Sequence, residues 1–173
     1  MDLLARLATW VEVDLDAVSR NYRRVRSILN PSTRFLAMVK ADAAGHGSIA
    51  VSRTLLEEGA DALGVATVLE GIELRQAGIE APILVATGNL PSQSGAVARN
   101  RLTPALFDME AALALSAIAS SLGLNVKVHI KIDTGMGRWG IACGNAYDFV
   151  EAVSKLPGLV VEGVFSHFAC AEE

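Results

Sequence analysis

The stretch FLAMVKADAAGHG, residues 35–47, indicates the class of fold and one candidate functional residue. Its first five residues, Phe35–Val39, form a short apolar run of the kind that makes a fully buried strand. Lys40 stands where this run stops, and a polar loop ending in glycines follows. Because a desolvated ammonium group is costly, Lys40 either reaches water at the rim of a sheet or is kept there as a reactive amine.

Buried runs like this one recur along the chain and alternate with amphipathic segments. We expect further strands at 62–66, 83–86, 103–106, 126–132 and 159–165, and helices near 47–58, 67–77, 108–122 and 144–155, with a short helix around 95–99. Apolar strands separated by helices predict an α/β fold with a parallel sheet covered on both sides. Successive strand ends lie roughly 20 to 34 residues apart, which fits both a (β/α)8 barrel and an open doubly wound sheet.

The first 34 residues do not follow this repeat. Trp10–Asp14 alternates between apolar and polar residues and predicts a strand with one exposed face. Asp16 is then expected to cap a helix that runs to about Leu29 and is stopped by Asn30-Pro31. We therefore divide the chain into a lead-in strand and helix, residues 1–34, and the repeating sheet, residues 35–173.

Composition narrows the class of protein. With 173 residues, 51% of them hydrophobic and 20% charged, the chain is long and apolar enough for one globular domain. A net charge of −4 leaves no broad basic surface, so we expect no nucleic-acid partner. No apolar run approaches a membrane span, and two cysteines without a basic leader favour the cytoplasm. His167 and Cys170 lack further ligands, so no metal site is expected.

Polar side chains follow directly on the expected strand ends. They are Lys40, Thr67, Thr87, Asp133 and Ser166-His167. In both a barrel and an open parallel sheet, ligands bind at the edge formed by the carboxyl ends of the strands. The sequence therefore predicts an active site at that edge.

The stretch HIKIDTGMGRWG, residues 129–140, carries several of these groups. His129, Lys131 and Asp133 alternate with apolar residues, so they share one face of a strand. Arg138 follows in a glycine-rich turn, where little side-chain bulk separates it from a ligand. An arginine in that place can make paired hydrogen bonds to a carboxylate or donate to a phenolate.

The turn Gly135–Gly140 also fits a rival function. It reads G-x-G-x-x-G after a strand, with Glu162 about 20 residues further on, which is the pattern of a dinucleotide-binding enzyme. Against this, the preceding strand carries Lys131 and Asp133, and Trp139 is bulky for a turn that must admit a pyrophosphate. A dinucleotide-binding enzyme that uses this turn remains an alternative function.

Taken together, these stretches resemble the fold-type III pyridoxal-phosphate family, and specifically the alanine racemases. VKADAAGHG is similar to the family's cofactor-lysine motif, KIDTGMGRWGI to its glycine-arginine motif, EGVFSHFACAEE to its histidine strand, and VEVDLDAVSRNYRRVR to its start. The order and separations of the motifs agree as well. The resemblance implies a (β/α)8 TIM-type barrel, of which this chain would hold about six strands, with residues 35–173 as its cofactor-binding part.

The resemblance also implies roles for four residues in the interconversion of L- and D-alanine, a route to D-alanine for the cell wall. Lys40 would bind pyridoxal 5'-phosphate covalently and act as one of two acid/base groups that move the α-proton. Arg138 would donate to the cofactor's phenolic oxygen and orient the substrate carboxylate. Lys131 corresponds to a lysine that is carbamylated in many members, and His167 would pack against the pyridine ring.

Two departures from the family pattern affect these expectations. Ala44 stands where the family normally has a tyrosine whose hydroxyl helps to hold the cofactor phosphate. The family also continues past the position of Glu173 into further barrel strands and a β-rich domain that supplies the second base across a homodimer. We therefore expect this chain to be an amino-terminal portion, inactive alone, of an enzyme for a small amino-acid substrate. A non-catalytic cofactor-binding or interaction module is the remaining alternative.

Overall fold

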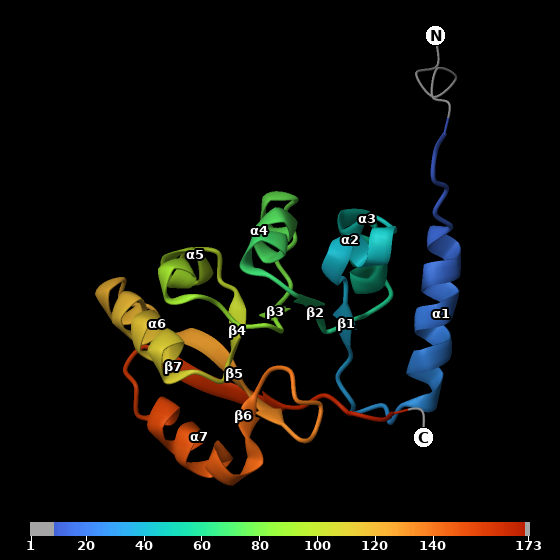
Figure 1. Ribbon diagram of the computed structural model, residues 1–173. Coiled ribbons are helices and arrows are strands. Elements are labelled where there is room, and N and C mark those ends of the chain that lie inside the picture. The colour runs from blue at the N-terminus through green and yellow to red at the C-terminus, as the bar shows by residue number, and fades with distance from the viewer. Residues whose placement is uncertain (1–8, 172–173) are drawn as a thin grey trace.

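A computed structural model describes residues 9–171 of the chain (Figure 1). The helices are α1 (Leu15–Ile28), α2 (Lys40–Gly45), α3 (Ser48–Glu57), α4 (Val68–Gln76), α5 (Ser94–Arg99), α6 (Met109–Ser121) and α7 (Ala146–Ser154), with short 3-10 turns η2 (Pro91–Gln93) and η3 (Cys143–Asn145). The strands are β1 (Leu36–Met38), β2 (Ala62–Val65), β3 (Ile83–Val85), β4 (Thr103–Leu106), β5 (Val126–Asp133), β6 (Ile141–Ala142) and β7 (Leu159–Phe165). Within these residues no helix is both long and apolar enough to cross a membrane.

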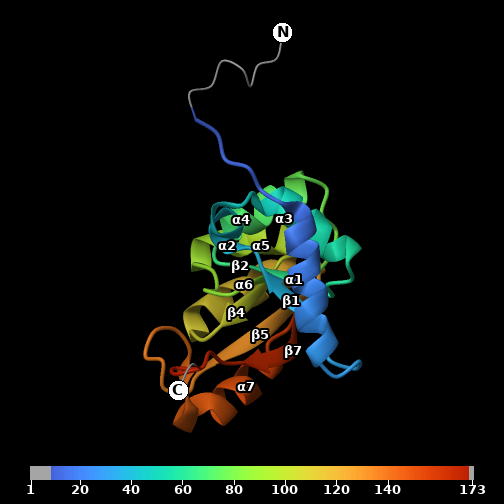
Figure 2. The same ribbon diagram turned by 90° about the vertical axis from the view of Figure 1, so that its right-hand side faces the viewer.

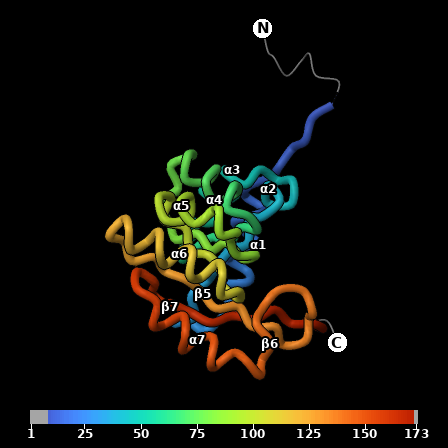
Figure 3. The backbone as a smooth tube through the Cα atoms, turned by 60° about the vertical axis from the view of Figure 1, so that its left-hand side comes forward, coloured from blue at the N-terminus to red at the C-terminus, as the bar shows by residue number. Residues whose placement is uncertain are grey.

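All strand pairs in the described residues are parallel. The order is β1-β2-β3-β4-β5-β6, and β7 pairs with the first part of β5, from Val126 to Lys131, while β6 pairs only with its end. Figures 1 and 3 show helices α3 to α7 following one another around the outer side of the curved sheet. The expected cover of helices on both faces is wrong for the part of the chain that the structure describes, because the inner face lines cavities instead.

Strand β5 shows how the sheet separates a core from a polar inner face. Val128 and Ile130 are fully buried in the hydrophobic core between sheet and helices. Lys127, His129 and Lys131 alternate with them and face the cavities of the inner side. Since successive side chains of a strand point to opposite faces, the alternation of residue types sets which side becomes core.

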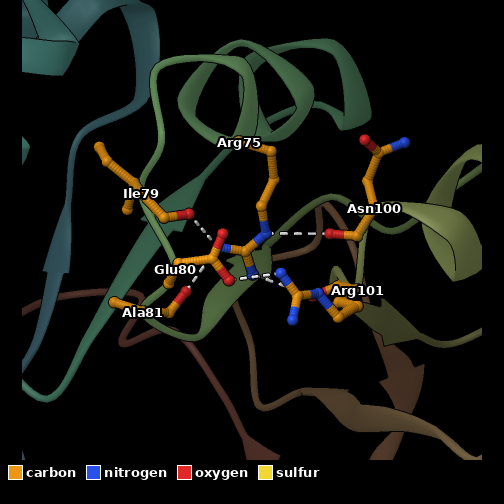
Figure 4. Close-up of polar contacts among 6 residues, drawn as sticks. All are labelled: Arg75, Ile79, Glu80, Ala81, Asn100 and Arg101. Carbon is orange, nitrogen blue, oxygen red and sulfur yellow. Dashed lines mark hydrogen bonds and ion pairs between the residues drawn. The ribbon is translucent and has the colours of Figure 1, made fainter.

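An arginine on α4 ties together the two loops that lead into β3 and β4 (Figure 4). The Arg75 guanidinium donates to the carbonyl oxygens of Ile79 (2.6 Å) and Ala81 (2.8 Å) before β3, and of Asn100 (2.9 Å) and Arg101 (3.0 Å) before β4. These carbonyls lie outside the strand ladders and would otherwise need water. Arg75 thus fixes the entry of two neighbouring strands at the edge of the sheet opposite the strand ends that carry Lys40 and Thr67.

The start of the chain differs from the sequence-based expectation. Residues 10–14 form no strand, and Trp10 and Val11 are exposed, because no neighbouring strand supplies backbone partners there. Asp14, not Asp16, caps α1: its backbone is extended and its carboxylate accepts from the Ala17 amide at 2.9 Å. Asp16 lies inside the first helical turn. Residues 1–8 of the expected lead-in unit lie outside the described residues.

Helix α1 lies beside β1 and α3, as two perpendicular views show (Figures 1 and 2). Tyr22 is buried and its ring meets that of Phe35 edge-on, with centroids 5.0 Å apart. Arg23 donates twice to the Glu58 carboxylate, at 2.6 and 2.5 Å. These contacts attach the helix to the first βα unit of the sheet.

Candidate active site

Lys40 lies at the point where β1 leaves the sheet. The amide of Val39 still donates to the Gly64 carbonyl of β2 at 2.7 Å. After Lys40 the chain enters a left-handed turn, with φ between +52° and +55° at each of Ala41–Ala44. Helix α2 is therefore left-handed at these four positions, which the sequence did not predict. Because this region is unfavourable for residues other than glycine, neighbouring contacts must hold the turn.

Several such contacts come from the turn itself and from α3. The Ala43 amide donates to the Val39 carbonyl at 2.9 Å. Asp42 accepts from the Ser48 amide at 2.6 Å through its side chain and from the Gly47 amide at 3.0 Å through its carbonyl. These bonds fasten the turn to the end of β1 and to the first residue of α3.

Glu70 on α4 makes the third fastening, and sequence reasoning missed it. Its carboxylate accepts from the backbone amides of Ala41 (2.8 Å), Ala66 (2.7 Å) and Thr67 (3.0 Å). Burial opposes ionisation of Glu70, but these three donors, together with the nearby charge of Lys40, outweigh it and lower the pKa of the carboxyl group. The spacing Thr67-x-x-Glu70 is a capping box, a signal that was available in the sequence.

Most of the side chains singled out from the sequence line one cavity of about 610 Å³, but Thr67 and Asp133 do not. Lys40 enters it from the end of β1, Lys131 from β5, Arg138 from the loop after β5, and His167 from the segment after β7. Thr87 also lines this cavity. The carboxyl ends of β1, β3, β5 and β7 thus converge on one space, as expected for a ligand site in a parallel sheet.

Lys131 is the buried cation of this cavity. The residue is 6% exposed, its ammonium donates to the Ala86 carbonyl at 3.1 Å, and it lies 5.4 Å from the centre of the Phe165 ring. Burial lowers the pKa of Lys131, the charge of Arg138 lowers it further, and Asp133 partly offsets both. The environment therefore favours a neutral, nucleophilic amine more than water does.

The loop that carries Arg138 is organised by Asp133 at the end of β5. The Asp133 carboxylate accepts from the amides of Gly137 and Gly135, both at 3.0 Å, and these bonds lower its pKa. Gly140 has φ +138°, and a Cβ there would lie 2.5 Å from the Asp133 backbone nitrogen. Only glycine fits this approach, so the loop returns tightly to β5 and presents Arg138 to the cavity.

The same loop lacks the setting of a dinucleotide fingerprint. That motif needs a strand, then the glycine turn, then a helix whose N-terminus holds the pyrophosphate. Here β6 and the 3-10 turn η3 follow the glycine turn, and α7 begins only at Ala146. The loop instead lies beside the segment after β7 (Figure 3), where the hydroxyls of Thr134 and Ser166 are 2.5 Å apart.

A second group of polar side chains lies deeper on the inner face. Glu162 of β7 accepts from Lys127 at 2.5 Å and lies 3.8 Å from His129. Gly163 makes room for the imidazole, since a Cβ there would be 2.8 Å from it. Lys127, His129 and Glu162, together with Arg34, line a cavity of about 280 Å³. Burial lowers the pKa of His129, while Glu162 opposes this shift and Arg34 adds to it.

Comparison with known proteins places this arrangement in a family. The family model described as alanine racemase, N-terminal domain, matches residues 13–173. The chain belongs to this family. Among curated members, the alanine racemase of Syntrophobacter fumaroxidans is 44% identical over 165 residues, which cover 95% of this chain and 44% of that protein. The chain thus spans less than half the length of this family member.

Solved structures of related proteins show the same fold. The alanine racemase of Clostridium difficile 630 matches with a TM-score of 0.93 at 36% identity, over 96% of this chain and 44% of that one. A histidine racemase from Leuconostoc mesenteroides matches with a TM-score of 0.82 at 26% identity, over 91% and 42% of the two chains. The described sheet is therefore part of the family's TIM-type barrel, and the open doubly wound sheet is excluded.

Proposed function

We propose that this chain is the cofactor-binding part of a pyridoxal-phosphate-dependent alanine racemase, which interconverts L- and D-alanine. The observation that carries the proposal is the meeting of Lys40, Lys131, Arg138 and His167 around one cavity in a member of this family. Its volume of about 610 Å³ lies within the range of small-ligand sites.

The donor set of the cavity fits this cofactor. Pyridoxal phosphate is an anionic aromatic aldehyde, and the exposed amine of Lys40 would hold it by condensing with the aldehyde carbon, with release of water. Arg138 can donate to its phenolic oxygen, and the apolar side chains of Leu36 and Met38 line the same cavity. Ala44, exposed in the left-handed turn, offers no hydroxyl to the phosphate. When bound, the cofactor supplies an electron sink that acidifies the α-hydrogen of an amino acid.

The residues of the chain would then bind and move a proton. The guanidinium of Arg138 would orient the substrate carboxylate, with the bonds of Asp133 to Gly135 and Gly137 keeping its loop in place. The Lys40 amine would remove or return the α-proton on one face of the substrate. Racemisation also needs a proton group on the opposite face.

We propose that the second proton group comes from outside the described residues, in a homodimer of the whole protein working in the cytoplasm. The chain covers 44% of the length of a curated member, which leaves room for such a group. We accordingly expect the chain alone to bind the cofactor without racemising alanine at an enzymatic rate. Because one structural relative is named a histidine racemase, alanine as the substrate is part of the proposal.

Borohydride trapping tests the proposal. The chain is mixed with pyridoxal phosphate, reduced, digested and mapped by mass spectrometry, with Lys40→Ala and Lys155→Ala as paired variants. We expect a pyridoxyl group on Lys40, absent in the first variant and retained in the second. Absence of a Lys40 adduct in the unaltered chain would overturn the proposal. An adduct without alanine turnover when the chain is joined to the remaining family domains would favour the non-catalytic module.

A further inference from the structure

The hydrogen-bond ladder between β1 and β2 stops next to Lys40 in an unusual way. The strands pair in parallel from Leu36 with Ala62 to Met38 with Gly64, and Val39 adds one more bond to the Gly64 carbonyl. In a regular parallel ladder the next two bonds would run from the Ala66 amide to the Val39 carbonyl and from the Ala41 amide to the Ala66 carbonyl. Neither partner is used in this way here.

The carbonyls of that ladder have found other donors. The Val39 carbonyl accepts from the Ala43 amide at 2.9 Å, inside the left-handed turn. The Ala66 carbonyl accepts from the Thr87 hydroxyl at 2.6 Å. The amides of Ala41, which is exposed, and of Ala66, which is partly buried, are thereby left without their ladder acceptors, and each needs another acceptor in its place.

Glu70 supplies the replacement for both amides. One carboxylate oxygen accepts from Ala41 at 2.8 Å, and the other accepts from Ala66 at 2.7 Å. A capping-box glutamate ordinarily reaches only the amide of the N-cap residue, which here is Thr67. The two extra bonds are therefore beyond the needs of helix α4.

We propose that Glu70 is a positioning residue for Lys40. Its carboxylate replaces the backbone acceptors that a longer β1–β2 ladder would supply, and so fixes the direction in which the lysine leaves the sheet. The amide of Ala41 adjoins the Lys40 carbonyl, so its bond to Glu70 sets the backbone orientation at the lysine. The charges of Glu70 and Lys40 also attract each other. The inference deepens the proposed function, since its importance rests on Lys40 as the cofactor-binding amine.

The alternative is that Glu70 only caps α4, and a matched variant separates the two. Asp108 caps α6 by accepting from the amides of Glu110 and Ala111, away from Lys40. Asp108→Ala therefore removes a helix cap without touching the left-handed turn. Glu70→Asp is the complementary change, because the shorter side chain keeps the charge near the Thr67 amide but cannot span to Ala41.

Two measurements on the folded chain test the inference. Amide hydrogen exchange at residues 41–44, without cofactor, reports whether the turn is held. After borohydride reduction, the amount of pyridoxyl label on Lys40 is compared with that on exposed Lys155. This ratio reports whether the Lys40 amine is oriented toward the cavity. We expect Glu70→Ala and Glu70→Asp to speed the exchange and to reduce the Lys40 share, each about tenfold or more. Asp108→Ala should leave both unchanged.

The outcomes are distinguishable. Unchanged exchange in both Glu70 variants, or an equal change in Asp108→Ala, overturns the positioning role whether or not cofactor binds. Faster exchange with no Lys40 adduct in the unaltered chain supports the fastening and overturns the proposed function. If Glu70→Ala does not fold, Glu70→Asp supplies the same comparison.

Discussion

The ammonium nitrogen of Lys131 donates to the carbonyl oxygen of Ala86 at 3.1 Å, from a residue that is only 6% exposed. Burial, followed by the charge of Arg138, lowers the pKa of this lysine. A buried amine that tends towards neutrality beside a guanidinium is suited to addition of carbon dioxide. The amine nitrogen bonds to the carbon, a proton is lost, and an anionic carbamate forms that Arg138 can pair with.

We therefore predict that Lys131 becomes carbamylated in bicarbonate. The chain equilibrated with 13C-labelled bicarbonate should show a carbamate carbon signal by NMR. The signal should vanish in Lys131→Met and persist in Lys127→Met, which alters an exposed lysine on the same strand face. A carbamate signal of equal size in Lys131→Met would contradict this assignment.

Arg75 should be a major contributor to stability, because its guanidinium satisfies four backbone carbonyls. Lysine keeps the charge but cannot bridge two loops with one ammonium. We expect Arg75→Lys to lower the free energy of unfolding by about 2 kcal/mol or more. The control is Arg53→Ala, which removes a single bond to the Ala77 carbonyl and should cost less than about 1 kcal/mol. Urea titration of both variants measures the difference, and equal losses would disprove it.

Two glycines of one loop should differ sharply in their tolerance of alanine. At Gly140 the new Cβ would lie 2.5 Å from the Asp133 nitrogen, whereas at Gly137, with φ +68°, it would meet nothing within 4 Å. We expect Gly140→Ala to cost about 3 kcal/mol of unfolding free energy and Gly137→Ala about 1 kcal/mol, the strain of the positive φ alone. Chemical denaturation tests the order. A Gly140→Ala chain as stable as Gly137→Ala would show that the loop does not return tightly to β5.

The partly buried histidine of β5, His129, should make the free energy of unfolding depend on pH. Burial lowers the pKa of His129 below its ordinary value of 6.5, with Glu162 opposing and Arg34 adding to the shift. As the pH falls through 6.5, His129 becomes protonated in the unfolded chain while it stays neutral in the folded chain. The free energy of unfolding therefore decreases. This decrease between pH 7 and pH 5 should be smaller in His129→Gln, measured by urea unfolding at each pH. His46→Gln, at an exposed site, is the control, and equal acid sensitivity in all three chains would refute the prediction.

The strands could be predicted from the sequence because their residue types alone specify burial. Residues 103–106 and 159–165 are β4 and β7 as the structure has them, and the other apolar runs differ by one residue or two at their ends. Strand β6 was missed because two residues, Ile141–Ala142, carry no periodicity. The convergence of Lys40, Arg138 and His167 on one cavity followed from a rule about parallel sheets rather than from local pattern.

The remainder depended on partners far away in the sequence. The alternation of residues 10–14 indicates a strand, but alternation cannot show whether a neighbouring strand is present. The left-handed turn at Ala41–Ala44 runs against the preference of alanine. It is held by the bond between its own Asp42 and the Ser48 amide and by the bond from the Ala41 amide to Glu70 of α4. The Thr67-x-x-Glu70 spacing indicates a helix start and no more, because the bond between Ala41 and Glu70 joins residues 29 positions apart.

The interleaved faces of β5 have a consequence for how such a protein can change over time. Val128 and Ile130 pack in the core with the helices. Lys127, His129 and Lys131 instead face the cavities of the inner side and contact whatever occupies them. Substitutions on the cavity face of the strand therefore need not disturb the packing of its core face. Descendant proteins can therefore acquire different cavity-lining residues, and with them a different ligand or reaction, while the fold is kept.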